Sequence, residues 1–307
     1  MLISEFFDSV YVPRRLRGKS QKTIRLYGLT IKQFGRSLGK LAELSDLTED
    51  NVLAHLARRH EVAPATRNKE LSQLIAIWRL AAQRKLIDTW PDLQAEDEPE
   101  RAPIAWLDNE LTRLLAAAAR MPRRIGKIPQ RVYWTLLIRL ILDTGERSGA
   151  IRQTEWSWFQ GEWLFVPAES RKGKTRDRRY RLSKETLTAI AAMRESSTDK
   201  QFVFPWPFSE SYFWVKYRAV VKEAGLPTSR NHQLHCLRKT TASAVYAAGL
   251  DPQEALDHSD KRTTRRYLDK RFTRSEQPCD VLAIFLANPT RSKPADPPAA
   301  SKSTKTG

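Results

Sequence analysis

The sequence predicts a mainly α-helical protein with a small antiparallel β-sheet, divided into two domains. Apolar residues recur every three or four positions through much of the chain, which is the spacing of one helix face. Short apolar stretches separated by turn signals lie between Glu155 and Leu182 and are typical of paired strands. Residues 91–106 combine prolines with acidic residues and separate the two halves as a linker would.

Residues 1–90 are predicted to form a small helical bundle. Ser20 and Thr48 are residue types that cap helix N-termini, and each precedes an apolar stripe. A third helix is expected from Ala65 to Lys85. The apolar positions of the three helices are Ile24, Tyr27, Ile31, Phe34 and Leu38, then Val52, Leu53 and Leu56, then Leu71, Leu74, Ile75 and Trp78.

Residues 107–288 are predicted to form the second domain, and residues 289–307, rich in Pro, Ser, Thr and Lys, a disordered tail. Asp108 is expected to cap the first helix of this domain. A helix from Gln130 to Thr144 is apolar nearly all round and is followed by Gly145, a favoured residue after a helix end. This helix is therefore expected to be buried, which would fix the position of Arg147 just beyond it.

The remaining elements of the second domain follow from local signals. Strands are expected at Glu155–Phe159, Trp163–Val166 and Arg178–Leu182, and helices from Ser183, from Ser209 to Ala224 and from Leu234 to Ala248. Trp206, Phe208, Phe213 and Trp214 would serve as base-stacking platforms or as core residues. Core packing is preferred, because aromatic residues at helical spacing are more often interior.

The net charge of +18 indicates a polyanionic partner. Charge alone does not separate nucleic acid from a membrane surface, but the chain lacks a basic amphipathic anchor, which favours nucleic acid. The longest apolar run is interrupted by Arg139, and no apolar signal core is present. Cys236 and Cys279 show no metal-ligand spacing. We therefore expect a cytoplasmic, nucleoid-associated protein with no membrane partner and no metal.

A group of phosphate-binding residue types lies in the C-terminal third of the chain. His235 and Arg238 are three residues apart, so on a helix they share a face and can address one anion together. His258 and Tyr267 follow. Each of these residues alone has an ordinary structural explanation, and a His-x-x-Arg pattern recurs by chance.

The full order of residues is more specific than any single motif. Arg147, Lys172 in a turn between strands, His235 and Arg238, His258 and Tyr267 follow one another along the chain. In this order the chain resembles the tyrosine recombinase (phage integrase) family, from about residue 4 to about residue 270. The resemblance implies a two-domain DNA clamp, in which an N-terminal helical bundle joins a mixed α/β catalytic domain.

The resemblance also implies a role for each residue. Tyr267 would attack a DNA phosphodiester and form a covalent 3′-phosphotyrosyl link, without metal, ATP or other cofactor. The other roles are Arg147 and Arg238 as the clamp on the non-bridging oxygens, His235 as general acid or base, His258 as a hydrogen-bonding support, and Lys172, with Lys174 as its competitor, as the acid that protonates the leaving 5′-oxygen.

Double-stranded DNA is the partner that the resemblance implies, and two groups of basic residues are candidates to contact it. Arg67 and Lys69 open the third helix, and Arg171, Lys174 and Arg176 surround the turn that carries Lys172. Solvated basic surfaces are the commoner meaning of such residues. The resemblance further implies self-association into a tetramer on DNA, with an apolar segment, Val281 to Leu286, docked on a neighbour.

Two positions depart from the family pattern. Ala150 stands where an acidic residue is common, and Asp257 stands where glycine is usual before the histidine. Two other functions use similar residues: DNA relaxation of the type IB topoisomerase kind, and DNA binding by a non-catalytic regulator on the same scaffold. The small N-terminal bundle favours a recombinase over the first, and the retained phenol argues against the second.

Overall fold

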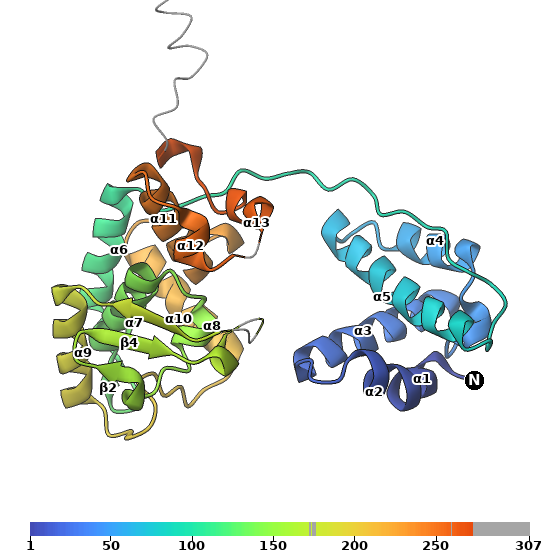
Figure 1. Cartoon of the computed structure of the whole chain (residues 1–307), viewed down its shortest axis with the longest axis horizontal. Helices are drawn as coiled ribbons and strands as arrows, with labels where there is room; N and C mark the ends of the chain where they lie inside the picture. Colours follow the sequence, from blue (N-terminus) through green and yellow to red (C-terminus); the bar gives the residue numbers. More distant parts are fainter. Residues whose placement is uncertain (172, 174–175, 259, 273–307) are drawn as a thin grey trace, which may run out of the picture. The chain divides into compact units, whose positions relative to one another are not determined.

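A computed structural model describes residues 1–171, 173, 176–258 and 260–272. The chain divides into two compact units (Figure 1), Met1–Arg101 and a second unit that begins at Ala102. The described residues do not include Lys172, Lys174, the segment from Val281 to Leu286 or the predicted tail. No helix among the described residues is long and apolar enough to cross a membrane.

The N-terminal unit is a bundle of helices, as predicted. Its elements are α1 (Ile3–Phe6), a π-helical turn (Phe7–Tyr11), α2 (Val12–Arg15), α3 (Gln21–Leu38), a 3-10 turn (Leu44–Asp46), α4 (Glu49–Arg58) and α5 (Pro64–Gln83). The Ser20 hydroxyl accepts a hydrogen bond from the Thr23 backbone at 3.2 Å, and Thr48 caps α4 through Asn51 at 3.3 Å. Both predicted caps are confirmed. Phe34 and Trp78 are among the buried residues at its centre.

Parts of the segment predicted as a linker contact one unit or the other, while residues 94–102 are exposed to solvent. In the N-terminal unit the Glu96 carboxylate accepts two hydrogen bonds from Arg67, at 2.6 and 2.7 Å. In the second unit Ala105 and Trp106 are buried, and the Ala105 amide donates to Asp269 at 2.8 Å. The boundary of the two units falls between Arg101 and Ala102.

The second unit is mainly helical around a central buried helix. Its helices are α6 (Asp108–Arg120), α7 (Gln130–Thr144), α8 (Ser148–Ile151), α9 (Lys184–Ser196), α10 (Glu210–Glu223), α11 (Leu234–Ala247), α12 (Pro252–Leu256) and α13 (Lys261–Arg265), with 3-10 turns at Trp156–Trp158, Ala168–Ser170, Arg230–His232 and Lys270–Phe272. Helices α6, α9 and α11 pack on α7 (Figure 1), which is buried as predicted. Glu110 rather than Asp108 caps α6, since its carboxylate accepts from the Leu107 amide at 2.9 Å.

The sheet is smaller than predicted at its first strand. Strands β3 (Phe159–Gln160), β4 (Trp163–Val166) and β5 (Arg178–Arg181) form an antiparallel sheet in the order β3-β4-β5, with Leu164 opposite Tyr180. The strand expected at Glu155–Phe159 is mostly a 3-10 turn, because Trp156 and Trp158 bend back into a local hydrogen-bonded turn. A second hairpin, β1 (Arg124–Ile125) and β2 (Ile128–Pro129), was not predicted.

The aromatic group near residue 206 belongs mainly to the core. Phe213 is buried, and Trp206 lies 5.1 Å from it, ring centre to ring centre. The prediction of core packing is wrong for Phe208, which is 48% exposed.

Candidate active site

Arg238 on α11 is buried at the centre of the site, with 1% of its surface exposed. Its guanidinium donates to the carbonyl of Gly145, to the carbonyl of Leu256 at 2.8 Å and to Nε2 of His258 at 3.0 Å. Its Nε has no hydrogen-bond partner within the described residues. Burial and the nearby positive charge of Arg147 lower the pKa of Arg238. The nearby Glu146 carboxylate offsets part of this effect. A buried guanidinium whose hydrogen-bond partners are neutral, beside another cation, favours a bound anion.

His258 links Arg238 to the segment that carries Tyr267. Arginine can only donate, so Nε2 of His258 accepts from it, and Nδ1 then carries the proton and donates to the Thr264 hydroxyl at 3.0 Å. Desolvation, followed by the charges of Arg238 and Arg147, lowers the pKa of His258 to about 4. The ring is therefore neutral at pH 7 when the anion site is empty.

Tyr267 lies directly beyond α13 and faces this group. Its ring centre is 4.7 Å from that of His258 and 5.0 Å from that of His235, and the guanidinium carbon of Arg238 lies 5.5 Å from the Tyr267 ring centre. The Ser243 hydroxyl on α11 donates to the Tyr267 carbonyl at 3.3 Å. Backbone and ring are thus both held against α11.

His235 lies in the first turn of α11 and is exposed to solvent. Desolvation by surrounding atoms, then the positive charges of Lys239, Arg238 and Arg147, lower the pKa of His235 to about 4. Both causes favour the neutral ring, which can accept a proton.

Arg147 is positioned by the turn that ends α7. Gly145 ends that helix in the left-handed conformation, with φ of 61°, and Arg147 follows as the N-terminal boundary residue of α8. A Cβ at Gly145 would come within 2.9 Å of Leu256. Arg147 lowers the pKa values of Arg238, His235 and His258, so its positive charge lies close to all three side chains.

The structure thus brings five of the predicted catalytic residues together, from α7–α8, α11, the end of α12 and the segment beyond α13. They are Arg147, His235, Arg238, His258 and Tyr267. Two guanidinium groups and two neutral imidazoles around a phenol suit the binding of a phosphate diester and the transfer of its phosphorus to the phenol oxygen.

Arg171 is not a surface residue, so the prediction that it contacts DNA does not fit its environment. It is 6% exposed, and its guanidinium donates to the Glu146 carboxylate at 2.5 Å and to the Asp257 carboxylate at 2.9 Å. Arg176 on the same loop is exposed and remains a candidate for DNA binding. Its Nε lies 3.4 Å from Asp257.

The Arg67 side chain is also bound by groups of its own unit. Its guanidinium binds both oxygens of Glu96 and also donates to the Val62 carbonyl at 2.6 Å. Lys69, two residues further along α5, is exposed. Of the two residues predicted to bind DNA, Arg67 is therefore engaged within the unit and Lys69 is open to solvent.

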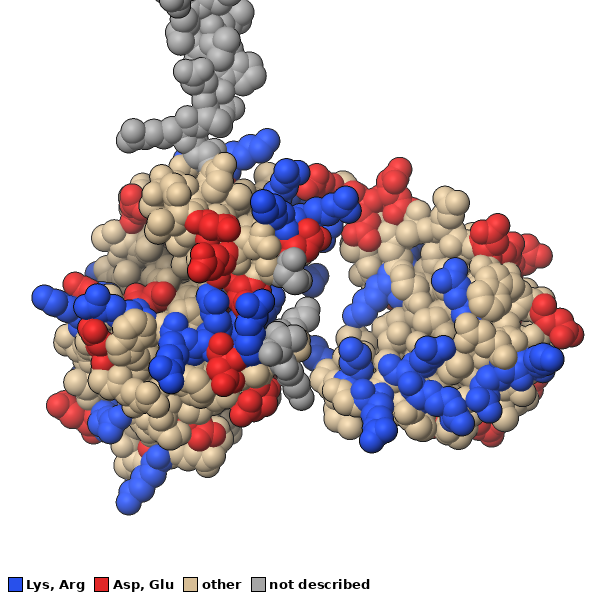
Figure 2. All heavy atoms as spheres, viewed as in Figure 1, with Lys and Arg blue, Asp and Glu red and all other residues tan. Residues whose placement is uncertain are grey.

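Helix α3 carries a basic face that was not predicted from the sequence. Lys22, Arg25, Lys32 and Arg36 are all exposed and lie on one face at the helical period of 3.6 residues. The spacing of these basic residues in the sequence could have predicted this face. The apolar residues of the same helix form a more regular pattern, which predicted the buried face instead. Figure 2 shows Lys and Arg side chains exposed on both units, with acidic side chains between them.

The two departures from the family pattern have local explanations. Ala150 is 3% exposed, so a small apolar side chain fits this position, and the nearby acidic residue along the chain, Glu146, is also buried. Asp257 ends α12 in the left-handed conformation, with φ of 52°, as a glycine would. Its carboxylate forms the ion pair with Arg171, so the residue supplies an interaction that glycine lacks.

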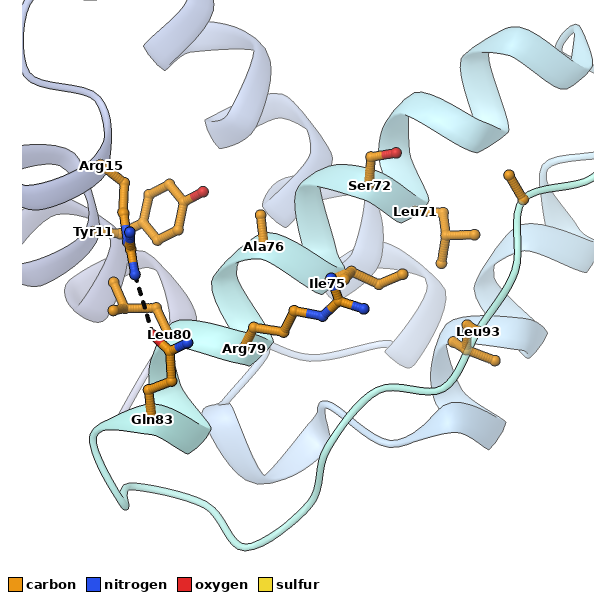
Figure 3. A pocket seen from close by; sticks show the side chains of 11 residues that line it. Tyr11, Arg15, Leu71, Ser72, Ile75, Ala76, Arg79, Leu80, Gln83 and Leu93 are labelled. Atoms are coloured by element: carbon orange, nitrogen blue, oxygen red, sulfur yellow. Dashed lines mark hydrogen bonds between the residues drawn. The ribbon is translucent and has the colours of Figure 1, made fainter.

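A separate hollow of about 530 Å³ lies on the N-terminal unit (Figure 3). It runs along α5 beside Ile75 and Arg79, and at one end Arg15 donates to Gln83 at 3.1 Å. The described residues that line it include no histidine, cysteine or carboxylate. It therefore lacks the proton-transfer groups found in the second unit.

Comparisons with solved structures show the same fold. A lambda integrase dimer bound to a COC′ core site is 20% identical, with a TM-score of 0.68 over 90% of this chain and 99% of that chain. The Tn1549 transposon integrase in complex with transposon right end DNA is 14% identical, with a TM-score of 0.68 over 94% and 99%. XerH site-specific recombinase bound to a palindromic difH substrate is 17% identical, with a TM-score of 0.65 over 90% and 82%.

Comparison with curated proteins gave no match. The sequence profile described as the phage integrase family matches residues 106–274, which is more than half of the chain and includes every residue of the candidate site. The matched residues thus lie in the second unit and include Arg238 and Tyr267. The chain belongs to the phage integrase family.

Proposed function

We propose that this protein is a tyrosine-type site-specific DNA recombinase. The observation that supports this most directly is the buried Arg238, held by neutral groups and flanked by Arg147, with the Tyr267 ring beside it. A structural arginine at such a depth is normally paired with a carboxylate. Arg238 forms no direct ion pair within the described residues, and the Glu146 carboxylate acts on it only as a nearby charge. A buried arginine with a second arginine and a phenol beside it suits covalent phosphoryl transfer.

In the proposed reaction the Tyr267 oxygen attacks the phosphorus of a DNA phosphodiester. A phosphorus–oxygen bond forms to Tyr267, and the bond from phosphorus to the 5′-oxygen breaks. His235, neutral because its pKa is about 4, accepts the phenol proton. Lys172 gives a proton to the departing 5′-oxygen, while Arg147 and Arg238 stabilise charge on the non-bridging oxygens.

The covalent intermediate conserves the energy of the broken bond. A 5′-hydroxyl of a second strand can therefore attack the phosphotyrosine and complete strand exchange. Two bound sites are needed, and we propose that four copies assemble on DNA, as in the lambda integrase tetramer bound to a Holliday junction. We also propose that the protein acts at the nucleoid, where its DNA substrate lies.

Trapping the covalent intermediate tests this function. Nicked duplexes taken from the DNA that flanks the gene are incubated with the protein and run on a denaturing gel. We expect a slower band containing both protein and DNA, absent in Tyr267→Phe because that variant lacks the attacking oxygen. Tyr246→Phe, which changes an exposed tyrosine on α11, is the matched control and should keep the band.

An adduct that persists in Tyr267→Phe would refute this nucleophile. Binding without any adduct in the wild type would favour a non-catalytic DNA-binding regulator. Relaxation of a supercoiled plasmid without product from two recombination sites would favour a topoisomerase.

A further inference from the structure

Three charged side chains form a buried chain of ion pairs beside the candidate site. Arg171 lies between two carboxylates: its Nε is 2.5 Å from Glu146, and its Nη2 is 2.9 Å from Asp257. The side chains of Glu146, Arg171 and Asp257 are 1%, 5% and 10% exposed. We call these residues the buried triad.

Each member of the buried triad directly precedes a proposed catalytic residue. Arg147 follows Glu146, Lys172 follows Arg171, and His258 follows Asp257. These three places are far apart in the sequence and belong to different elements: the turn after α7, the loop before β5 and the end of α12. One guanidinium therefore ties together the backbone at three separate parts of the site.

The interactions of the triad reach the backbone as well as the side chains. The second Glu146 oxygen accepts from the Arg147 amide at 3.1 Å, and Arg171 also donates to the Arg176 carbonyl at 2.8 Å, across the base of its loop. The first Glu146 oxygen accepts a further bond from the Tyr180 hydroxyl on β5 at 2.8 Å. Asp257 has a left-handed backbone that its side-chain ion pair helps to hold.

We propose that Glu146, Arg171 and Asp257 act as positioning residues, which hold Arg147 and His258 in the geometry needed for phosphoryl transfer. This inference rests on the proposed function. It also gives a role to one departure from the family pattern, because Asp257, which stands where glycine is usual, is one end of the triad. Buried charges left without their partners cost several kcal/mol, so the three residues act as a unit.

Arg171→Lys is the first test. Lysine keeps the positive charge, but a single ammonium lacks the planar fork that reaches two carboxylates and the Arg176 carbonyl. We expect covalent cleavage of saturating nicked DNA to slow about 10- to 100-fold, the effect of displacing reacting groups by about 1 Å. The Kd for DNA should stay within about threefold. Arg181→Lys, at an exposed ion pair on β5, should cleave at the wild-type rate.

A second variant separates positioning from stability. Glu146→Gln, Arg171→Met and Asp257→Asn combined remove all three triad charges while nearly keeping their shapes, so no member of the triad is left as an unpaired buried charge and the fold should be retained. Arg238 loses the favourable charge of Glu146 in this variant. We expect a melting temperature close to that of the wild type together with slow cleavage. Recovery of both stability and the wild-type rate in this triple variant would overturn the proposal.

The proposal would also fail if Arg171→Lys cleaved as fast as the wild type. Failure of the proposed function gives a different result, because the wild type itself would then form no adduct with the same nicked DNA.

Discussion

In the proposed function Arg238 binds two sets of acceptors, the backbone carbonyls that fix it and the oxygens of a phosphate. Only a guanidinium has enough donors for both. Its terminal nitrogens bind the carbonyls of Gly145 and Leu256, which fixes the side chain, while the group remains charged next to Arg147. A lysine at this position has one nitrogen for all these acceptors and for the phosphate.

Arg238→Lys is therefore expected to lower the single-turnover cleavage rate about 10²- to 10³-fold, as the loss of a preorganised donor at a developing charge does. Rates of covalent adduct formation at saturating DNA measure this effect. Arg179→Lys on β5, at an exposed arginine, serves as the control and should have no such effect. A rate within twofold of the wild type for Arg238→Lys would contradict the assigned role.

The pKa of His258 predicts a pH effect on stability. The folded pKa is about 4, below the ordinary value of about 6.5, so between these values the unfolded chain binds a proton that the folded protein does not. The contribution of His258 is therefore complete above pH 6.5 and is lost as the pH falls toward 4. Urea unfolding at pH 7 and pH 5 measures the change.

Other histidines with lowered pKa values also make the protein less stable as the pH falls. The contribution of His258 is therefore measured by comparing the wild type with His258→Gln. That variant should lose less stability between pH 7 and pH 5 than the wild type does. Equal losses would mean that His258 is protonated normally in the folded protein.

At the scale of secondary structure elements, the end of α7 determines how the site is assembled. Gly145 has a positive φ, and an added Cβ would meet Leu256 at 2.9 Å and Thr241 at 3.3 Å. Leu256 is 1% exposed and has little room to move. The junction of α7, α11 and α12 thus has space for glycine alone.

Gly145→Ala should lower the free energy of unfolding by about 2–3 kcal/mol, from backbone strain and overpacking together. Gly161→Ala is the matched control, since Gly161 also has a positive φ, of 59°, but nothing within 4 Å of the added Cβ. It should cost about 1 kcal/mol, from strain alone. Equal losses in urea unfolding would show that the packing against Leu256 is not tight.

The basic face of α3 is the element that we expect to bind DNA phosphates in the N-terminal unit. Changing Lys22, Arg25 and Lys32 to Gln should weaken binding and reduce the slope of log Kd against log salt by roughly one for each phosphate that is no longer neutralised. Arg67→Gln should instead lower stability and leave the slope unchanged, because Arg67 is bound to Glu96. An unchanged slope in the α3 variant would exclude this face.

Local signals in the sequence predicted the elements better than the interactions between them. Caps such as Ser20 involve residues three positions apart, and the burial of α7 follows from its composition. The ion pairs of Arg171 and Arg67 join residues that only the folded chain brings together, so both arginines looked like surface charges. The 3-10 turn at Trp156–Trp158 was predicted as a strand because its residues also favour strands.

At the scale of the whole molecule, two units share one strongly basic chain of net charge +18. The described arginines differ in their surroundings: some bind carboxylates inside a unit, others lie exposed, and Arg238 is buried beside Arg147 and the Tyr267 ring. The family order of residues predicted the cluster of Arg147, His235, Arg238, His258 and Tyr267, because the proposed phosphoryl transfer requires these residue types. The buried triad, which only holds them, was not predicted.

Identification of the residue that becomes joined to DNA tests the account most directly. The covalent adduct formed on nicked DNA is digested with protease and nuclease, and the peptide that carries the residual nucleotide is sequenced by mass spectrometry. We predict a 3′-phosphate ester on Tyr267 and no other modified residue. A nucleotide attached to any other side chain, or a DNA-bound wild-type protein that never becomes joined, would contradict the central claim.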